Sequence, residues 1–148
     1  MLELTSHKER EIDAPADRVW SLIADFGAIG DWWPPGLITK VENVGEGVGM
    51  VRHIHTLIGI VLQEKLESID DEKRCLELTI VGDLPAGMSD YQARGKLHEL
   101  GPDRCRIEWT GTYKVPGPEA EKAARGFIEG AYEAMFQGLA DASEQPAR

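Results

Sequence analysis

One acidic residue, Glu64, has the strand parity of an apolar set. Residues 60–69 are predicted to form a strand in which Ile60, Leu62 and Leu66 share one face, and Glu64 falls on that same face. A carboxylate on the covered face of a sheet is costly to bury without a partner. Such a group can act as a general acid or base, or it can anchor a hydroxyl or an amine of a ligand. Glu64 is therefore the first candidate site residue.

Arg52 is the expected partner of Glu64. If a tight turn near Ile58-Gly59 pairs Thr56 with Ile60, then Arg52 lies opposite Glu64 on the preceding strand. A slip of one residue would turn Arg52 to water and leave Glu64 alone. We prefer the first register because an unpaired buried carboxylate is costly. Such a pair can serve the fold alone, or it can also orient a ligand.

Tyr91 is the third polar candidate, because its strand parity also points it under the sheet. It could donate a hydrogen bond to a ligand carbonyl or stabilise charge beside a catalytic Glu64; alternatively it is a core tyrosine bonded to backbone. The other predicted ligand-contacting residues are apolar and share inward parity or one helical stripe. They are Ile54, Leu62, Leu78, Trp109, Phe127, Ala131 and Met135.

Histidine and cysteine patterns indicate no further chemistry. His53-x-His55 has the spacing of a metal pair, but both side chains have outward parity, and His98 lies on a strand that is not adjacent. Cys75 has outward and Cys105 inward parity, so they are not expected to form a disulfide. We find no catalytic triad pattern, phosphate loop or dinucleotide fingerprint, and we predict neither a metal nor a cofactor.

The order of elements predicts an α+β fold with a seven-stranded antiparallel sheet, since short turns join consecutive strands. Two short helices follow the first strand, with Asp13 as the expected N-cap and Gly27 and Gly30 at the end. A long helix runs from Glu119 to about Ala142. The predicted strands are 3–12, 37–44, 49–57, 60–69, 74–81, 89–100 and 104–115.

Small residues on the inner face suggest a cavity beneath the long helix. Ala93, Gly95 and Gly111 have inward parity on neighbouring strands and would leave space. Gly126, Gly130 and Gly138 on the long helix indicate either a cavity or close backbone packing. The irregular segment around Trp32 and Trp33 either shapes one mouth of the pocket or forms a packed corner.

The overall composition restricts the partners. The chain has 26 acidic and 16 basic residues and a formal net charge of −10, which disfavours nucleic acids and anionic membrane surfaces. No apolar run is long enough for membrane insertion, and two cysteines are too few for a disulfide framework, so we expect a cytoplasmic protein. We expect one domain over residues 1–148, frayed from about Ser143, that is a monomer or a homodimer.

Five segments within residues 8–142 resemble one protein family. EIDAPADRVWSLIADFGAIGDWW (11–33) is similar to its strand–helix entry, and IEWTGTY (107–113) to its penultimate element. GEGVGMVRHI (45–54), QEKLESIDDEKR (63–74) and SDYQARGKLHEL (89–100) are similar to its central strands. On these segments the chain resembles the polyketide cyclase/dehydrase and lipid-transport family of the helix-grip (SRPBCC, START-like) superfamily. The resemblance implies a curved sheet wrapped around the C-terminal helix.

Two positions depart from that family. Many relatives carry an acidic residue where Thr112 stands, and Leu57-Ile58-Gly59 is a tight turn in place of the gate loop of the plant hormone receptors.

The resemblance, together with the inward residues, predicts binding of a hydrophobic or aromatic small molecule such as a polyketide, lipid, sterol-like or terpenoid compound. The alternatives are a cofactor-free cyclase, dehydratase or lyase that uses Glu64 as acid/base with Arg52 or Tyr91, and an interaction module with a vestigial pocket.

Overall fold

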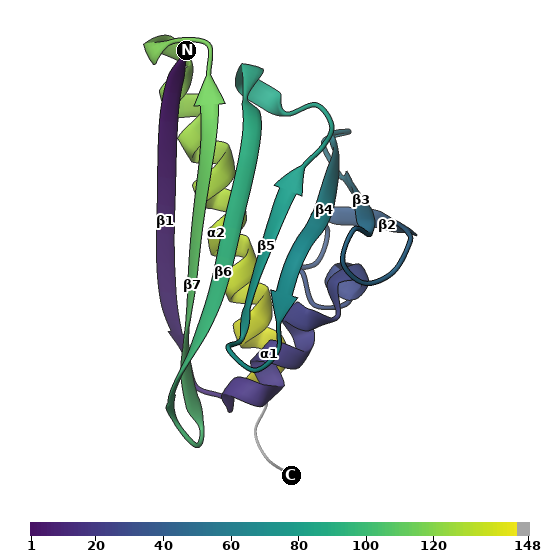
Figure 1. Ribbon diagram of the computed structural model, residues 1–148, viewed down its shortest axis with the longest axis vertical. Helices are drawn as coiled ribbons and strands as arrows, with labels where there is room; N and C mark the ends of the chain where they lie inside the picture. Colours follow the sequence, from purple (N-terminus) through teal and green to yellow (C-terminus); the bar gives the residue numbers. More distant parts are fainter. Residues whose placement is uncertain (145–148) are drawn as a thin grey trace.

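A long helix lies across one face of a curved antiparallel sheet in this computed structural model, which describes residues 1–144 (Figure 1). The strands are β1 (Leu2–Ile12), β2 (Ile38–Val44), β3 (Val51–Thr56), β4 (Val61–Asp70), β5 (Cys75–Ile80), β6 (Ser89–Gly101) and β7 (Arg104–Val115). The helices are α1 (Ala16–Ala24), α2 (Glu121–Ser143) and the 3₁₀ turns η1 (Phe26–Asp31), η2 (Pro85–Gly87) and η3 (Pro118–Ala120). Across the described residues the strand order is β1-β7-β6-β5-β4-β3-β2. The α+β helix-grip architecture is therefore confirmed.

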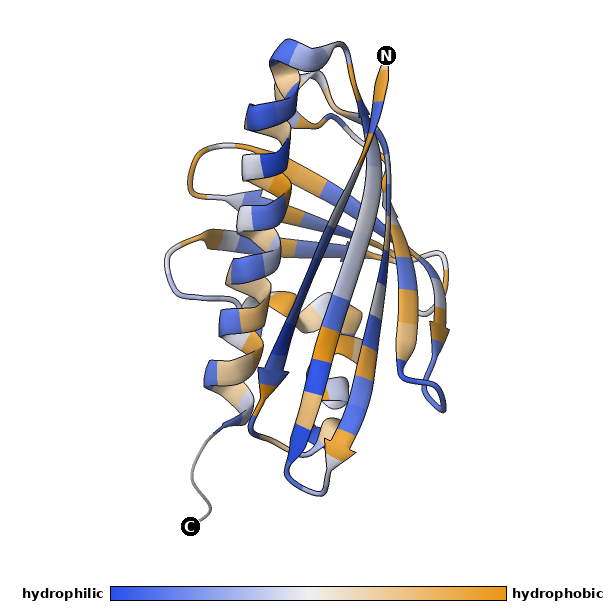
Figure 2. Cartoon of the chain, turned by 90° about the vertical axis from the view of Figure 1, so that its left-hand side faces the viewer, coloured by the Kyte–Doolittle hydropathy of each residue, from blue (hydrophilic) through white to orange (hydrophobic). Residues whose placement is uncertain are grey.

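Alternating side chains explain why the sheet has one covered face. Hydrophobic and hydrophilic residues alternate along the strands (Figure 2), and on β6 and β7 the apolar set turns toward the covered face. On β7 the inward residues are nearly inaccessible, whereas their neighbours are partly exposed. Full burial of a large apolar side chain such as that of Ile107 stabilises the fold by roughly 1.5–3 kcal/mol. The predicted inward residues of β6 and β7 are buried as expected: Tyr91, Ala93, Gly95, Leu97, Cys105, Ile107, Trp109, Gly111 and Tyr113.

The predicted pairing of β3 with β4 is confirmed. Arg52 lies opposite Glu64 and Ile54 opposite Leu62. Beyond Leu66, however, a β-bulge interrupts the pairing of β4 with β5, so that Ser68 pairs with Glu77. The bulge shifts the parity of the rest of β4, which simple alternation along the sequence does not anticipate.

The start of α1 differs from the prediction. Pro15, and not Asp13, is the N-cap residue, and no side chain caps this helix. Pro15 keeps an extended ψ of 140°, and its carbonyl accepts the first helical bond from Val19 at 3.2 Å. The backbone N–H of Asp13 instead donates to Glu144 Oε2 at 2.9 Å. The helix ends at Ala24, before the glycines that were expected to end it, because the chain tightens into η1.

The C-terminal end of α2 is joined to α1 at Ser143. This residue is buried, its hydroxyl donates to the Leu139 carbonyl at 2.5 Å, and its own carbonyl accepts from Arg18 Nη1 at 2.8 Å. The helix ends at this residue, and residues 145–148 of the expected tail lie outside the described residues. Among the helices of residues 1–144, none has the length and apolarity needed to cross a bilayer.

Replacing two different glycines of α2 with alanine is expected to change the stability of the fold in opposite directions. A Cβ at Gly126 would meet no atom within 4 Å, whereas a Cβ at Gly138 would lie 2.4 Å from the Trp32 carbonyl oxygen. Gly126→Ala is expected to raise the free energy of unfolding by about 0.5–1 kcal/mol, because glycine is a poor helix former. Gly138→Ala is expected to lower it by about 1–3 kcal/mol through overpacking. Urea denaturation measures both, and equal responses would contradict the close approach at Gly138.

Candidate functional site

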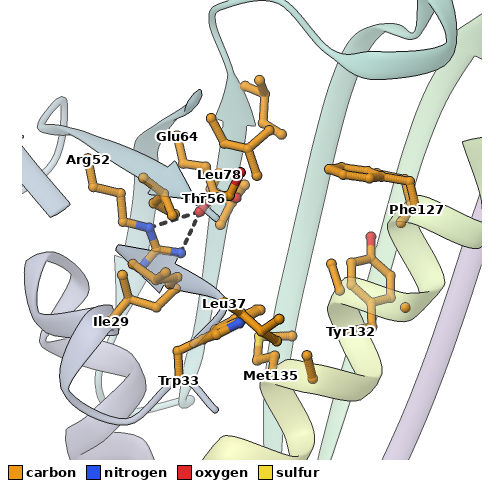
Figure 3. Close-up of a pocket in the computed structure, with 18 of the residues that line it drawn as sticks. Ile29, Trp33, Leu37, Arg52, Thr56, Glu64, Leu78, Phe127, Tyr132 and Met135 are labelled. Atoms are coloured by element: carbon orange, nitrogen blue, oxygen red, sulfur yellow. Dashed lines mark hydrogen bonds and ion pairs between the residues drawn. The ribbon is translucent and has the colours of Figure 1, made fainter. Parts of the chain in front are cut away.

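A pocket of about 310 Å³ lies between α2 and the inner face of the sheet (Figure 3). Its wall is almost entirely apolar, and Arg52 and Glu64 contribute the charged groups of its lining. The structure places all ten predicted ligand-contacting residues in this wall, although their contact with a ligand stays a prediction. They are Arg52, Ile54, Leu62, Glu64, Leu78, Tyr91, Trp109, Phe127, Ala131 and Met135.

The Arg52–Glu64 pair is the polar centre of one side of the pocket. Arg52 Nε and Nη2 donate to Glu64 Oε1 at 2.9 and 2.6 Å. Only 7% of the Arg52 side chain and 15% of the Glu64 side chain are exposed. The guanidinium also lies 3.7 Å from the centre of the Phe26 ring and donates through Nη1 to the Phe26 carbonyl at 2.8 Å. The Phe26 ring and three hydrogen bonds thus hold the arginine in place before any ligand arrives.

This arrangement leaves one carboxylate oxygen available. Both hydrogen bonds from Arg52 end on Oε1, and no residue within 1–144 donates to Glu64 Oε2. Burial lowers the pKa of the Arg52 guanidinium, and the adjacent Glu64 carboxylate opposes that shift. Because arginine remains protonated in proteins, the pair is ionic. Glu64 Oε2 can therefore accept a hydrogen bond or a proton from a molecule in the pocket.

Two tyrosine hydroxyls form the polar group of the opposite side. Tyr91 and Tyr132 are both buried, and their hydroxyl oxygens lie 2.7 Å apart. Burial raises the pKa of Tyr91 well above its usual value and also raises that of Tyr132. Both hydroxyls therefore stay protonated near neutral pH. One proton is used within the pair, so the pair retains a second proton that it can donate to a ligand oxygen.

Tyr132 was missed by the sequence reasoning, although a signal for it exists. It lies four residues after Ile128 and three before Met135, which is the spacing of one helix face. Tyr132 lines the pocket together with these two neighbours. The sequence prediction for this helix face included apolar residues alone. It therefore left out Tyr132, the residue of α2 that brings a hydroxyl group to the pocket.

The tyrosine pair predicts loss of stability at alkaline pH. The folded protein holds both phenolic protons more tightly than the unfolded chain, whose tyrosines ionise near pH 10. The associated stability is complete below about pH 10 and is lost as pH rises above it. Urea denaturation between about pH 8 and 11 should give a shallower decline for Tyr132→Phe than for the wild type. Identical slopes would contradict this assignment.

The inward glycines do not create the cavity, which corrects the expectation from small residues. A Cβ at Gly95 would lie 2.1 Å from the Trp109 ring, and a Cβ at Gly111 would lie 2.0 Å from the Tyr132 hydroxyl oxygen. These glycines therefore admit aromatic side chains of the pocket wall. Open space is found instead on α2, where Gly130 lines the pocket and a Cβ there would meet nothing within 4 Å.

The two adjacent tryptophans have different roles. Trp33 lines the pocket, whereas Trp32 is buried, approaches Gly138 and donates from Nε1 to the Leu22 carbonyl at 3.2 Å. Trp33 therefore agrees with the expectation that this segment shapes the pocket, and Trp32 agrees with the alternative expectation of a packed corner. Two residues of the β3–β4 turn, Leu57 and Ile58, also line the pocket although they are 68% and 73% exposed. The pocket therefore opens past an apolar rim.

The other chemistry-capable residues lie away from this pocket. His55 Nε2 is 2.7 Å from Glu42 Oε1 on the neighbouring strand, and His98 Nε2 is 3.3 Å from Glu108 Oε1. Cys75 and Cys105 are both free thiols, as their opposite parities predict. Burial raises the pKa of the Cys105 thiol to about 11, so it is a poor nucleophile at neutral pH.

Comparison with known proteins identifies a family. The family model described as polyketide cyclase/dehydrase and lipid transport matches residues 3–144. Norbelladine synthase from Narcissus pseudonarcissus is 31% identical over 126 residues, which are 78% of this chain and 77% of that protein. S-norcoclaurine synthase 1 from Papaver somniferum is 30% identical over 127 residues, which are 79% of this chain but only 55% of that protein.

A solved structure extends the comparison to the fold. Norcoclaurine synthase from Thalictrum flavum, in complex with dopamine and hydroxybenzaldehyde, superposes with a TM-score of 0.81 at 25% sequence identity. The superposition covers 99% of this chain and 90% of that one. That relative therefore has the same helix-grip architecture and holds aromatic small molecules in its complex.

Proposed function

Because the chain belongs to the polyketide cyclase/dehydrase and lipid transport family, we propose that it binds a hydrophobic or aromatic small molecule between α2 and the sheet. Candidate ligands are polyketides, lipids, sterol-like compounds and terpenoids. The observation that carries the proposal is a buried ion pair that faces an otherwise apolar pocket of about 310 Å³. Pockets of this kind bind mainly through apolar contact and use a few fixed polar groups for orientation.

The polar groups on opposite sides would orient the ligand. Figure 3 shows Arg52 and Glu64 across the pocket from Phe127 and Tyr132. A ligand hydroxyl or amine would donate to Glu64 Oε2, and a ligand oxygen would accept from the Tyr91–Tyr132 pair. Apolar burial, at roughly 25 cal/mol per Å², would supply most of the affinity. Because Phe26 already holds Arg52 in place, binding would order few side chains.

A second candidate function is catalysis without a cofactor. It is favoured by relatives that are named synthases, among them norbelladine synthase at 31% and S-norcoclaurine synthase 1 at 30% identity. In a cyclase, dehydratase or lyase, Glu64 would accept or return a proton through Oε2. The neutral Tyr91–Tyr132 pair would donate a hydrogen bond to an oxygen on which negative charge develops. Arg52 would keep the Glu64 carboxylate in position before the transfer.

The Glu64→Gln substitution separates binding from catalysis. Glutamine preserves the volume, so we expect the fold to be retained. Native mass spectrometry of the purified protein, and thermal shift with a library of aromatic and polycyclic compounds, would first supply a ligand. A carrier should lose only modest affinity in Glu64→Gln, whereas an enzyme should lose turnover by about a hundredfold or more while still binding.

The matched control is Glu77→Gln, which removes a charge from an exposed position on the neighbouring strand β5. It should change neither affinity nor turnover. If no compound in the library raises the melting temperature and none copurifies with the protein, the binding proposal and the catalytic one both fail.

A further inference from the structure

A second cluster of donor groups lies on the opposite face of the sheet from the pocket. His7 and Glu9 are exposed on β1, and Glu108 is partly exposed on the adjacent strand β7. One donor atom from each of the three lies within 4.8 Å of the other two. Their strand parity turns them away from the pocket, none of them lines it, and the proposed function does not use them.

The distances in this cluster do not fit direct hydrogen bonds. His7 Nε2 is 3.5 Å from Glu9 Oε2 and 3.8 Å from Glu108 Oε2. Charge-assisted hydrogen bonds between nitrogen and oxygen are about 2.7–2.9 Å long. Two ligands of one tetrahedral zinc ion, each about 2.0–2.1 Å from the metal, lie roughly 3.3 Å apart. The two distances from His7 Nε2 are therefore close to that spacing, and the two carboxylate oxygens lie within 4.8 Å of each other.

The imidazole of His7 is oriented by a neighbour. Its Nδ1 lies 2.7 Å from the Thr110 hydroxyl oxygen, on the residue directly opposite in β7. When Nδ1–H donates to that oxygen, the lone pair of Nε2 faces the two carboxylates. Metal-ligating histidines are commonly held in this way through their second nitrogen. Glu108 is held similarly, since its other oxygen lies 3.3 Å from His98 Nε2.

The strand register gives an independent reason for a cation here. Glu9 lies directly opposite Glu108 in the β1–β7 pairing. Like charges in this relation destabilise a sheet unless something screens them. The nearest basic residues only partly do so: Arg106 acts weakly on Glu108, and Lys96, opposite Glu108 on β6, directs its amine to the Lys73 carbonyl at 3.3 Å. Because Arg106 and Lys96 lie near Glu108, we expect only a moderate affinity for a cation at this site.

We propose that His7, Glu9 and Glu108 bind one Zn²⁺ ion, with water as the fourth ligand. The ion would be held by His7 Nε2 and one carboxylate oxygen from each glutamate, a donor set that suits zinc. It would join the first strand of the chain to the seventh and neutralise the Glu9–Glu108 repulsion. The site is separate from the ligand pocket, and the proposal stands or falls independently of the proposed function.

The test is calorimetric titration of the chelator-treated full chain with ZnCl₂ near pH 7.5. We expect one equivalent with a micromolar Kd. His7→Asn and Glu108→Gln should each raise the Kd by about tenfold or more, and Thr110→Val by about tenfold. Bound Co²⁺ should show the strong visible absorption of a tetrahedral site in the wild type and lose it in His7→Asn. Excess Zn²⁺ should also raise the melting temperature.

His55→Asn is the matched control, because His55 forms an exposed pair with Glu42 that lacks a second carboxylate. Its Kd for Zn²⁺ should equal that of the wild type. Absence of saturable binding at one equivalent would overturn the proposal, and so would an unchanged Kd in both His7→Asn and Glu108→Gln. If either variant melts abnormally without metal, Glu9→Gln replaces it, with the same expected increase in Kd.

Discussion

Arg52→Ala is expected to lower the free energy of unfolding by about 3–5 kcal/mol. The substitution leaves the Glu64 carboxylate, whose side chain is 15% exposed, without either of its hydrogen bonds. It also removes the donor to the Phe26 carbonyl and the contact with the Phe26 ring. Urea denaturation followed by circular dichroism measures the loss.

Two further variants show whether this loss arises from the unpaired charge. Arg52→Met combined with Glu64→Leu should recover most of the stability, because replacing both members of a buried pair with apolar residues is often neutral. Arg104→Ala removes an exposed arginine that pairs with Glu11 and should cost at most about 1 kcal/mol. If Arg52→Ala cost no more than Arg104→Ala, the pair would not be a buried structural element, and its role in the proposed site would lose its basis.

Gly95→Ala is the second substitution with a large expected effect. Its Cβ would lie 2.1 Å and 2.4 Å from two atoms of the Trp109 ring, on the residue directly opposite in β7. Overpacking of this kind typically costs about 1–3 kcal/mol. If the ring moves to relieve the contact, it moves within the pocket wall. We therefore expect a lower melting temperature, altered tryptophan fluorescence and weaker binding of any pocket ligand.

Gly101→Ala provides the comparison within the same strand, since a Cβ at Gly101 would meet no atom within 4 Å. This variant should keep the fluorescence spectrum and the ligand affinity of the wild type. A Gly95→Ala protein that retains wild-type stability and fluorescence would show that Trp109 does not rest on Gly95 in solution.

These two expectations describe how the site is supported. On one side of the pocket, Arg52 is held between Phe26 and Glu64. On another side, the Trp109 ring packs against Gly95. In both cases the group that faces the pocket is positioned by a residue behind it. Stability and ligand binding should therefore change together at Arg52 and Gly95. In Glu64→Gln the fold should be retained while ligand binding or turnover changes, because the amide oxygen can still accept the hydrogen bonds from Arg52.

Local patterns in the sequence were enough for the strands and for one side of the site. Alternation places Leu62 and Glu64 on one face, and a single tight turn brings Arg52 opposite Glu64. These are short-range relations with a period of two residues, so they can be read from neighbouring positions. The same reasoning could have included Tyr132, which shares the helix face of Ile128 and Met135.

Contacts between distant segments were decided only by the tertiary structure. The bulge after Leu66 depends on how β4 and β5 fit together, and the backbone N–H of Asp13, the expected N-cap, donates to Glu144 at the other end of the described chain. Whether an inward glycine leaves a void depends on which ring reaches it from another element. The Trp109 ring fills the space at Gly95 and the Tyr132 hydroxyl fills it at Gly111, whereas a Cβ at Gly130 would meet no atom within 4 Å. Periodicity records which face a residue takes, but cavity volume depends on side-chain packing in three dimensions.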